Sequence, residues 1–81
     1  MLKQYQPVVL VLDSFTTTFF GKTVRLTRGQ KGEVMEVFKH PDATGYAVEF
    51  FNEKGESIAV AVLEEGDIAP LNPDGSFSAV A

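Results

Sequence analysis

The sequence has no cysteine, no tryptophan and a single histidine, and these absences exclude several kinds of site. Without cysteine there is no disulfide, no thiolate ligand for a metal and no thiol nucleophile. Secreted domains of this size usually depend on disulfides, so we expect a cytoplasmic protein. No apolar run approaches the ~20 residues that span a bilayer, and we expect no contact with a membrane.

Polar side chains that could converge on a substrate are also scarce. The only histidine, His40, lies in a Pro-Asp turn, where an exposed side chain is expected. Glu64, Glu65 and Asp67 are close in sequence, but acidic clusters in turns are usually solvated. A metal site would need several convergent ligands. We therefore expect a protein that is not an enzyme, with no catalytic residue, no metal and no cofactor.

The charge balance argues against nucleic acid as the partner. Seven Lys and Arg residues face eleven Asp and Glu residues, giving a net charge of −4. Nucleic-acid binders usually present a basic face, because phosphate neutralisation supplies most of their affinity. One local cluster, of Lys22, Arg25, Arg28 and Lys31, is typical of a solvated turn. Its alternative interpretation is an RNA-binding patch formed by Arg25, Arg28 and Lys31.

The chain is long enough for one small domain. It has 81 residues, of which 44% are hydrophobic and seven are phenylalanine. This composition fills one compact core and leaves little room for a deep pocket. We expect a single domain over residues 1–71, followed by a poorly ordered tail over residues 72–81, which is rich in turn residues.

Apolar runs separated by turn residues predict about five antiparallel strands in a small, partly open barrel. The expected strands are residues 7–13, 32–39, 46–52, 56–63 and 68–71, with a short extended piece over residues 23–27. Glycine, proline and aspartate occupy the segments between them, as tight turns require. Pro70 places the last strand at an edge, because proline cannot donate to a central ladder.

Two details predict where this barrel is irregular. The apolar positions change phase between Val34 and Val37, which indicates a β-bulge. Gly32 is expected where the chain bends hardest or where another strand comes close. The polar break at residues 64–67 is compatible with one helical turn.

Glu49 lies on an alternating strand, facing away from the expected core residues. A solvent-facing carboxylate is the simpler interpretation. The alternative is an ion pair across the sheet with Arg25 or Lys31, which would stabilise the fold by at most ~1 kcal/mol if exposed.

Residues 14–23 (SFTTTFFGKT) combine three phenylalanines with four threonines, an unusual composition for the connecting loop that we expect here. Two hypotheses follow. Phe15, Phe19 and Phe20 fold back and cap an open end of the barrel, or some of them stay exposed and bind a partner or a second copy. Grouped exposed aromatic side chains are an interface signal.

The strand pattern resembles a family of small bacterial proteins of unknown function, frequent in cyanobacteria, that have an SH3-like barrel. The matching residues are Lys31, Gly32, Val34, Val37, Tyr46, Val48, Glu49, Phe50, Gly55, Ile58, Val60, Leu63, Asp67, Ile68, Pro70 and Leu71. The resemblance covers residues 7–71 and implies the fold, but no activity. In that family the segment after the first strand is more polar and glycine-rich, whereas this chain has Phe19-Phe20 and two extra threonines.

Two functions are open at this point. The first is a protein-interaction module, which binds through the aromatic segment or by strand addition at an edge. Its partner would be an unknown protein or a second copy of the chain, as in an accessory subunit or an immunity or antitoxin partner of a neighbouring gene product. The second is an RNA- or ribosome-associated domain, because Gly29, Gly32 and Val34 resemble the start of KOW modules.

Overall fold

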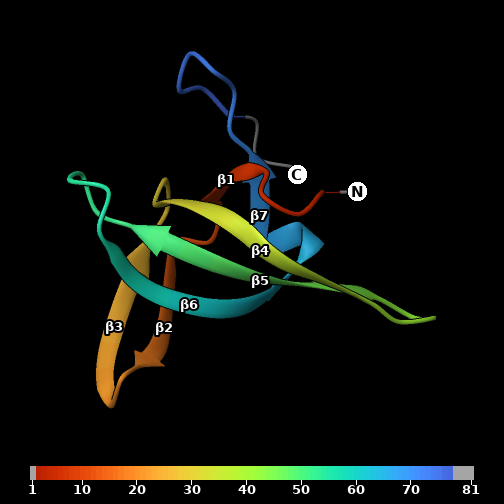
Figure 1. The fold of residues 1–81 in the computed structure, drawn as a ribbon, viewed down its shortest axis with the longest axis horizontal. Coiled ribbons are helices and arrows are strands. Elements are labelled where there is room, and N and C mark those ends of the chain that lie inside the picture. The colour runs from red at the N-terminus through yellow and green to blue at the C-terminus, as the bar shows by residue number, and fades with distance from the viewer. Residues whose placement is uncertain (1, 78–81) are drawn as a thin grey trace.

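The computed structural model of the chain describes residues 2–77, which form seven strands and one 3-10 turn. The elements are β1 (Pro7–Leu10), β2 (Ser14–Phe19), β3 (Lys22–Thr27), β4 (Lys31–Lys39), β5 (Thr44–Phe51), β6 (Ser57–Glu64), η1 (Glu65–Asp67) and β7 (Ile68–Pro70). Figure 1 shows these elements along the chain. In the described part, no helix is both long and apolar enough to cross a membrane.

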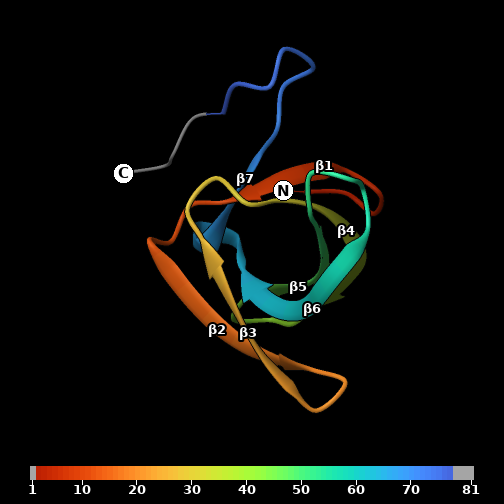
Figure 2. The same ribbon diagram turned by 90° about the vertical axis from the view of Figure 1, so that its left-hand side faces the viewer.

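Five strands form one antiparallel sheet in the order β6-β5-β4-β1-β7. The sheet curls around a central core without closing, and the separate β2–β3 hairpin lies outside the curl (Figure 2), with β2 beside β6. The prediction of an all-β, partly open barrel is confirmed. The predicted edge position of the last strand is also confirmed, and the polar break contains η1, where Asp67 Oδ2 accepts a hydrogen bond from Glu64 N at 3.0 Å.

The expected loop at residues 14–23 is wrong, because this segment is mostly a strand. β2 pairs with β3 from Ser14 opposite Thr27 to Phe19 opposite Lys22. Threonine and phenylalanine favour the extended backbone, and only Phe20 and Gly21 are needed for the turn between the two strands. The short extended piece expected at residues 23–27 is therefore one half of a hairpin.

The predicted bulge in β4 is confirmed. The register with β5 shifts between Val34 and Glu36, so Met35 is the extra residue. Before the bulge Val34 is buried, and after it Val37 packs against the core while Phe38 is exposed. The change of phase seen in the sequence is therefore the change of face that a bulge produces.

Gly32 lies where a neighbouring strand approaches so closely that no side chain fits. It is buried, with Val8 of β1 opposite it on one side and Phe50 of β5 on the other. A Cβ atom here would lie 2.7 Å from the Glu49 carbonyl oxygen and 2.9 Å from Val48 Cγ1. The prediction of a close approach at Gly32 is confirmed.

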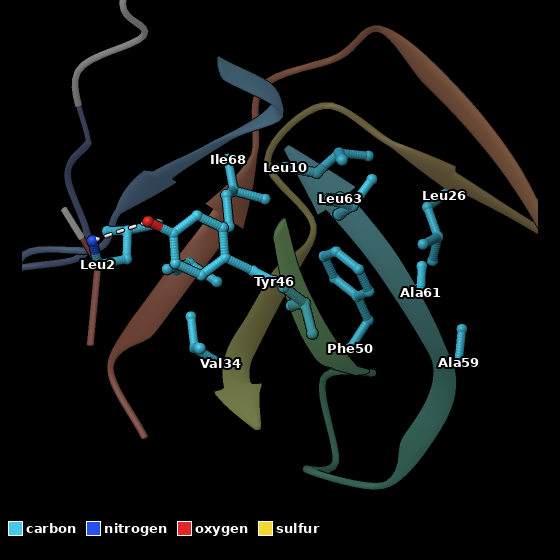
Figure 3. Packing of buried hydrophobic residues seen from close by; sticks show 12 residues of the cluster. Leu2, Leu10, Leu26, Val34, Tyr46, Phe50, Ala59, Ala61, Leu63 and Ile68 are labelled. Carbon is cyan, nitrogen blue, oxygen red and sulfur yellow. Dashed lines mark hydrogen bonds between the residues drawn. The ribbon is translucent and has the colours of Figure 1, made fainter. Parts of the chain in front are cut away.

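The core fills the inside of the curled sheet (Figure 3). Its buried members are Leu2, Val8, Leu10, Leu26, Val34, Tyr46, Val48, Phe50, Ala59, Ala61, Leu63 and Ile68. Tyr46 brings the one hydroxyl group of this cluster, and it is satisfied: it accepts from Leu2 N and donates to Glu65 Oε1, both at 3.2 Å. Burial first, and the Glu65 carboxylate after it, raise the pKa of Tyr46 above its ordinary value of 10.0.

A second apolar cluster lies on the other side of β1 and β7. Its members are Val9, Val11, Ala69, Leu71 and Phe77. The chain reaches Phe77 through a turn in which Asn72 N donates to Ser76 O at 2.9 Å. The first part of the expected tail thus packs onto the sheet. Residues 78–81 lie outside the described residues, and the predicted poor order of the tail stays a prediction.

We expect Gly32→Ala to lower the free energy of unfolding by about 1–3 kcal/mol, because the added methyl group meets backbone that cannot move aside. Gly66→Ala is the matched control, since nothing lies within 4 Å of a Cβ atom at Gly66. Urea unfolding of the two variants measures the difference. Equal stability of Gly32→Ala and the wild type would show that β4 has room to shift.

We expect Tyr46→Phe to lower the free energy of unfolding by about 1–3 kcal/mol near neutral pH, because Leu2 N loses its buried acceptor. The raised pKa of Tyr46 adds a dependence on pH. The unfolded chain loses this proton first, so wild-type stability is full below pH 10.0 and falls as the pH rises through the folded value. Urea unfolding at several alkaline pH values should show a shallower decline for Tyr46→Phe; parallel declines would contradict this account.

Candidate functional site

The β2–β3 hairpin has one apolar face and one polar face, because side chains alternate along both strands. On the apolar face Phe15 is paired with Leu26 and Thr17 with Val24. Leu26 is fully buried, and Phe15 and Val24 pack against the main core. The polar face is exposed and consists of Ser14, Thr16, Thr18, Thr23, Arg25 and Thr27. For Phe15 the arrangement is therefore the one that the capping hypothesis expects.

The hairpin tip is different, because it carries aromatic side chains that the core does not take up. The rings of Phe19 and Phe20 meet edge to face, with centroids 4.5 Å apart and an interplanar angle of 62°. Phe19 is half-buried, whereas Phe20 is 90% exposed. The tip therefore presents an aromatic side chain almost entirely to solvent.

The backbone at this tip is unusual for phenylalanine. Phe20 has φ +51° and Gly21 has φ +77°, the positive values that a two-residue type I′ turn requires at both central positions. Asn-Gly is the sequence that such a turn prefers, and a bulky side chain at positive φ is an outlier. Phe20 is thus outside the buried core and has a backbone conformation that is unfavourable for its residue type.

Tyr5 shares the positive φ but has a structural reason for it. Its φ is +67° and its ring is 63% exposed. Its backbone N–H donates to the Val34 carbonyl at 2.6 Å, next to the bulge of β4, so the sheet itself fixes this conformation. Within residues 2–77, Tyr5 and Phe20 are the only non-glycine residues with positive φ. A comparable backbone contact does not explain Phe20.

The three residues of the alternative RNA patch do not form one surface, because Arg25 lies apart from Arg28 and Lys31. Arg25 is on the polar face of the hairpin, where its Nε donates to Ser14 Oγ at 3.3 Å. Arg28 Nη1 donates to the Val11 carbonyl at 2.5 Å and so joins the turn before β4 to the end of β1. Lys31 is exposed at the start of β4. Part of this basic cluster therefore has a structural role.

Arg28 and Lys31 border an open depression of about 470 Å³ between two turns. Its lining residues are Thr27, Arg28, Gly29, Gln30, Lys31, Phe51, Asn52 and Glu53. Arg25 is not among them, and Glu53 brings a carboxylate to the same depression. The structure thus brings two of the three basic residues together and adds an opposing charge.

The family comparison covers both the sheet and the hairpin. A domain of unknown function, DUF4926, matches residues 8–70. The chain belongs to the DUF4926 family. The matched segment nearly coincides with residues 7–71, over which the sequence resembles a family of unknown function. No curated protein and no solved structure matches the chain.

Two further polar residues of this DUF4926 chain, Glu49 and His40, lie on different elements of the described structure. Glu49 lies opposite Glu33 on β4 and Val60 on β6, and these cross-strand neighbours are not the cations expected for an ion pair. His40 is exposed in the turn between β4 and β5. Among residues 2–77 no three His, Asp or Glu side chains lie close enough together to hold a metal ion.

The sequence pattern missed the hairpin and with it the difference between Phe15 and Phe20. The signal was present, since Phe15, Thr17 and Phe19 alternate with Thr16 and Thr18. Two alternating strands joined by a two-residue turn with Gly at its second position predict a hairpin. Phe20 differs from Phe15 and Phe19 because it belongs to the turn and not to the strand.

We expect Phe20→Asn to raise the free energy of unfolding by about 0.5–1 kcal/mol, because Asn accepts positive φ at this turn and no buried contact is lost. Urea unfolding of the purified DUF4926 chain measures the change. The control is Thr16→Asn on the exposed hairpin face, where the extended backbone gives Asn no such advantage. Destabilisation by Phe20→Asn would mean that the ring supports the fold.

Proposed function

We propose that this DUF4926 chain is a non-enzymatic protein-interaction module that binds its partner through the hairpin tip, with Phe20 as the central contact and Phe19 beside it. The observation that carries the proposal is the 90% exposure of Phe20 in an unfavourable backbone conformation. Strain that the fold does not use is a marker of function. Phe15, by contrast, supports the hairpin from its core side.

The energetics favour a contact at this position. Burying a phenylalanine side chain is worth about 1.5–3 kcal/mol, a large share of the energy of a small interface. Aromatic side chains are enriched in the cores of interfaces. The hairpin holds the ring on a short, paired support, so little conformational freedom is lost on binding. Strand addition at β7 is less suited, because this edge has three residues and ends at Pro70.

The finer features of the proposal rest on the resemblance and on composition. The curled five-stranded antiparallel sheet supports an SH3-like barrel. The absence of cysteine supports a cytoplasmic protein, and the resemblance to small bacterial proteins supports a bacterial one. Its partner is a protein, either a second copy or the product of a neighbouring gene, for which the chain acts as an accessory, immunity or antitoxin subunit.

The alternative is a KOW-like domain that binds RNA or the ribosome. The depression shared by Arg28 and Lys31 favours it, because Phe51 and Asn52 could contact a base beside two cations. The Arg28 hydrogen bond to Val11 and the presence of Glu53 weaken it. We therefore prefer the aromatic tip as the contact.

Affinity capture from cells that express the tagged chain tests the proposed function. We expect the recovery of a stoichiometric protein partner to fall at least about tenfold for Phe20→Asn, the loss of one interface hot spot. Thr16→Ser on the exposed hairpin face should leave recovery unchanged. Equal recovery for Phe20→Asn and the wild type would exclude the tip as the contact. RNA that is recovered in place of protein, and that is released steeply by salt, would favour the alternative.

A further inference from the structure

The outer sides of the sheet differ in what covers them. Phe77 packs over the outer side of β1 and β7, but no described segment covers the outer side of β4, β5 and β6. We call this second surface the outer wall. Apolar side chains are exposed on it: Phe38 is 40% exposed, Val60 39% and Val62 67%. Val62 also lies directly opposite the half-buried Ala47, so the apolar part is continuous across two strands.

One end of the outer wall is hollowed. An open depression of about 330 Å³ lies between the β4–β5 turn and the end of β6, large enough to take one aromatic ring. Phe38 and Val62 form its apolar sides, and Glu64 adds a carboxylate. Ala43 and Gly45 leave it open because their side chains are so small.

Carboxylates surround this apolar surface. Glu33 and Glu49 are directly opposite each other on β4 and β5, an arrangement in which like charges destabilise a sheet. Glu36, opposite Ala47, and Glu64, opposite Gly45, are exposed. Within the described residues neither Glu33 nor Glu49 forms an ion pair. A partner that is both cationic and apolar would therefore complement the outer wall.

The chain itself carries a surface of that kind. Residues 14–32 contain no Asp or Glu, and Lys22 is two residues from the exposed Phe20 at the hairpin tip, whereas Arg25 lies farther down the hairpin, opposite Thr16. The hairpin projects away from the barrel in both views (Figures 1 and 2). Its tip is thus available to another molecule.

We infer that the outer wall binds the hairpin tip of a second copy of this chain. Phe20 of one copy enters the depression between Phe38 and Val62 of the other, while Lys22 beside it approaches the carboxylates of the wall. The inference rests on the proposed function, because it takes the tip as the contact, and it names a second copy as the partner. Two copies make this contact twice, hairpin to wall and wall to hairpin, which closes a twofold dimer.

The dimer is expected to be weak and sensitive to salt. A hairpin tip on a shallow depression gives a small interface, typical of transient complexes. Its charges are exposed, so an ionic strength near 1 M should screen them. We expect a dissociation constant on the order of 10–100 µM at low salt, rising at least about tenfold at high salt.

Reversal of charge on the two surfaces tests the inference. The hairpin variant is Lys22→Glu, and the wall variant is Glu36→Lys with Glu49→Lys. By sedimentation equilibrium at low salt, each variant alone should be monomeric. An equimolar mixture should dimerise again, because each reversed hairpin then meets a reversed wall. Lys54→Glu, in the exposed β5–β6 turn, is the control for charge alone and should dimerise as the wild type does.

Val62→Ser and Phe20→Asn test the apolar part without a change of charge. Each should raise the dissociation constant at least about tenfold, and thermal melting confirms that each variant is folded. A wild-type chain that stays monomeric at roughly millimolar concentration would overturn the inference. So would a dimer that persists in both charge-reversed variants. If the chain is monomeric but Phe20→Asn still loses a captured protein, the proposed function is retained and the inference that the partner is a second copy is rejected.

Discussion

The close approach of backbone at Gly32 is the constraint on which the rest of the structure depends. Only a residue without a side chain lets β4 pass so near the Glu49 carbonyl oxygen while pairing with β1 on its other edge. The sheet can then curl tightly enough for Tyr46 and Phe50 to share one core. Three residues later the bulge at Met35 sharpens the twist and turns Phe38 outward. The shape of the outer wall therefore follows from how β4 is built.

The hairpin joins a stable base to an unfavourable tip. At the base, Leu26 and Phe15 are held by the core, which fixes the direction of both strands. At the tip, Phe20 has a backbone conformation that a glycine or an asparagine would adopt at lower cost. A small domain has a limited margin of stability, and Phe20 reduces this margin without adding buried contacts, which supports the proposed role of the tip in binding.

Much of the fold follows from the sequence, because local patterns determine it. The change of phase between Val34 and Val37 indicates the bulge, and Gly32 marks the close approach, since both depend on residues near each other in the chain. The hairpin was missed because Phe20 interrupts the alternation at the position where a turn begins. The outer wall is even harder to predict from the sequence. Its acidic character depends on the pairing of Glu33 with Glu49, a register that no local pattern specifies.

The separation of charge along the chain connects the tip with the wall. Carboxylates are absent from residues 14–32, and the outer side of β4–β6 collects several of them in one place. An even distribution would relieve the repulsion between Glu33 and Glu49 at no cost to the core, because their side chains face outward. The uneven distribution of charge makes the hairpin and the outer wall complementary. Electrostatic attraction can then orient approaching molecules before any apolar contact forms. In the proposed dimer Phe20 supplies the short-range apolar part of the contact, which salt does not screen.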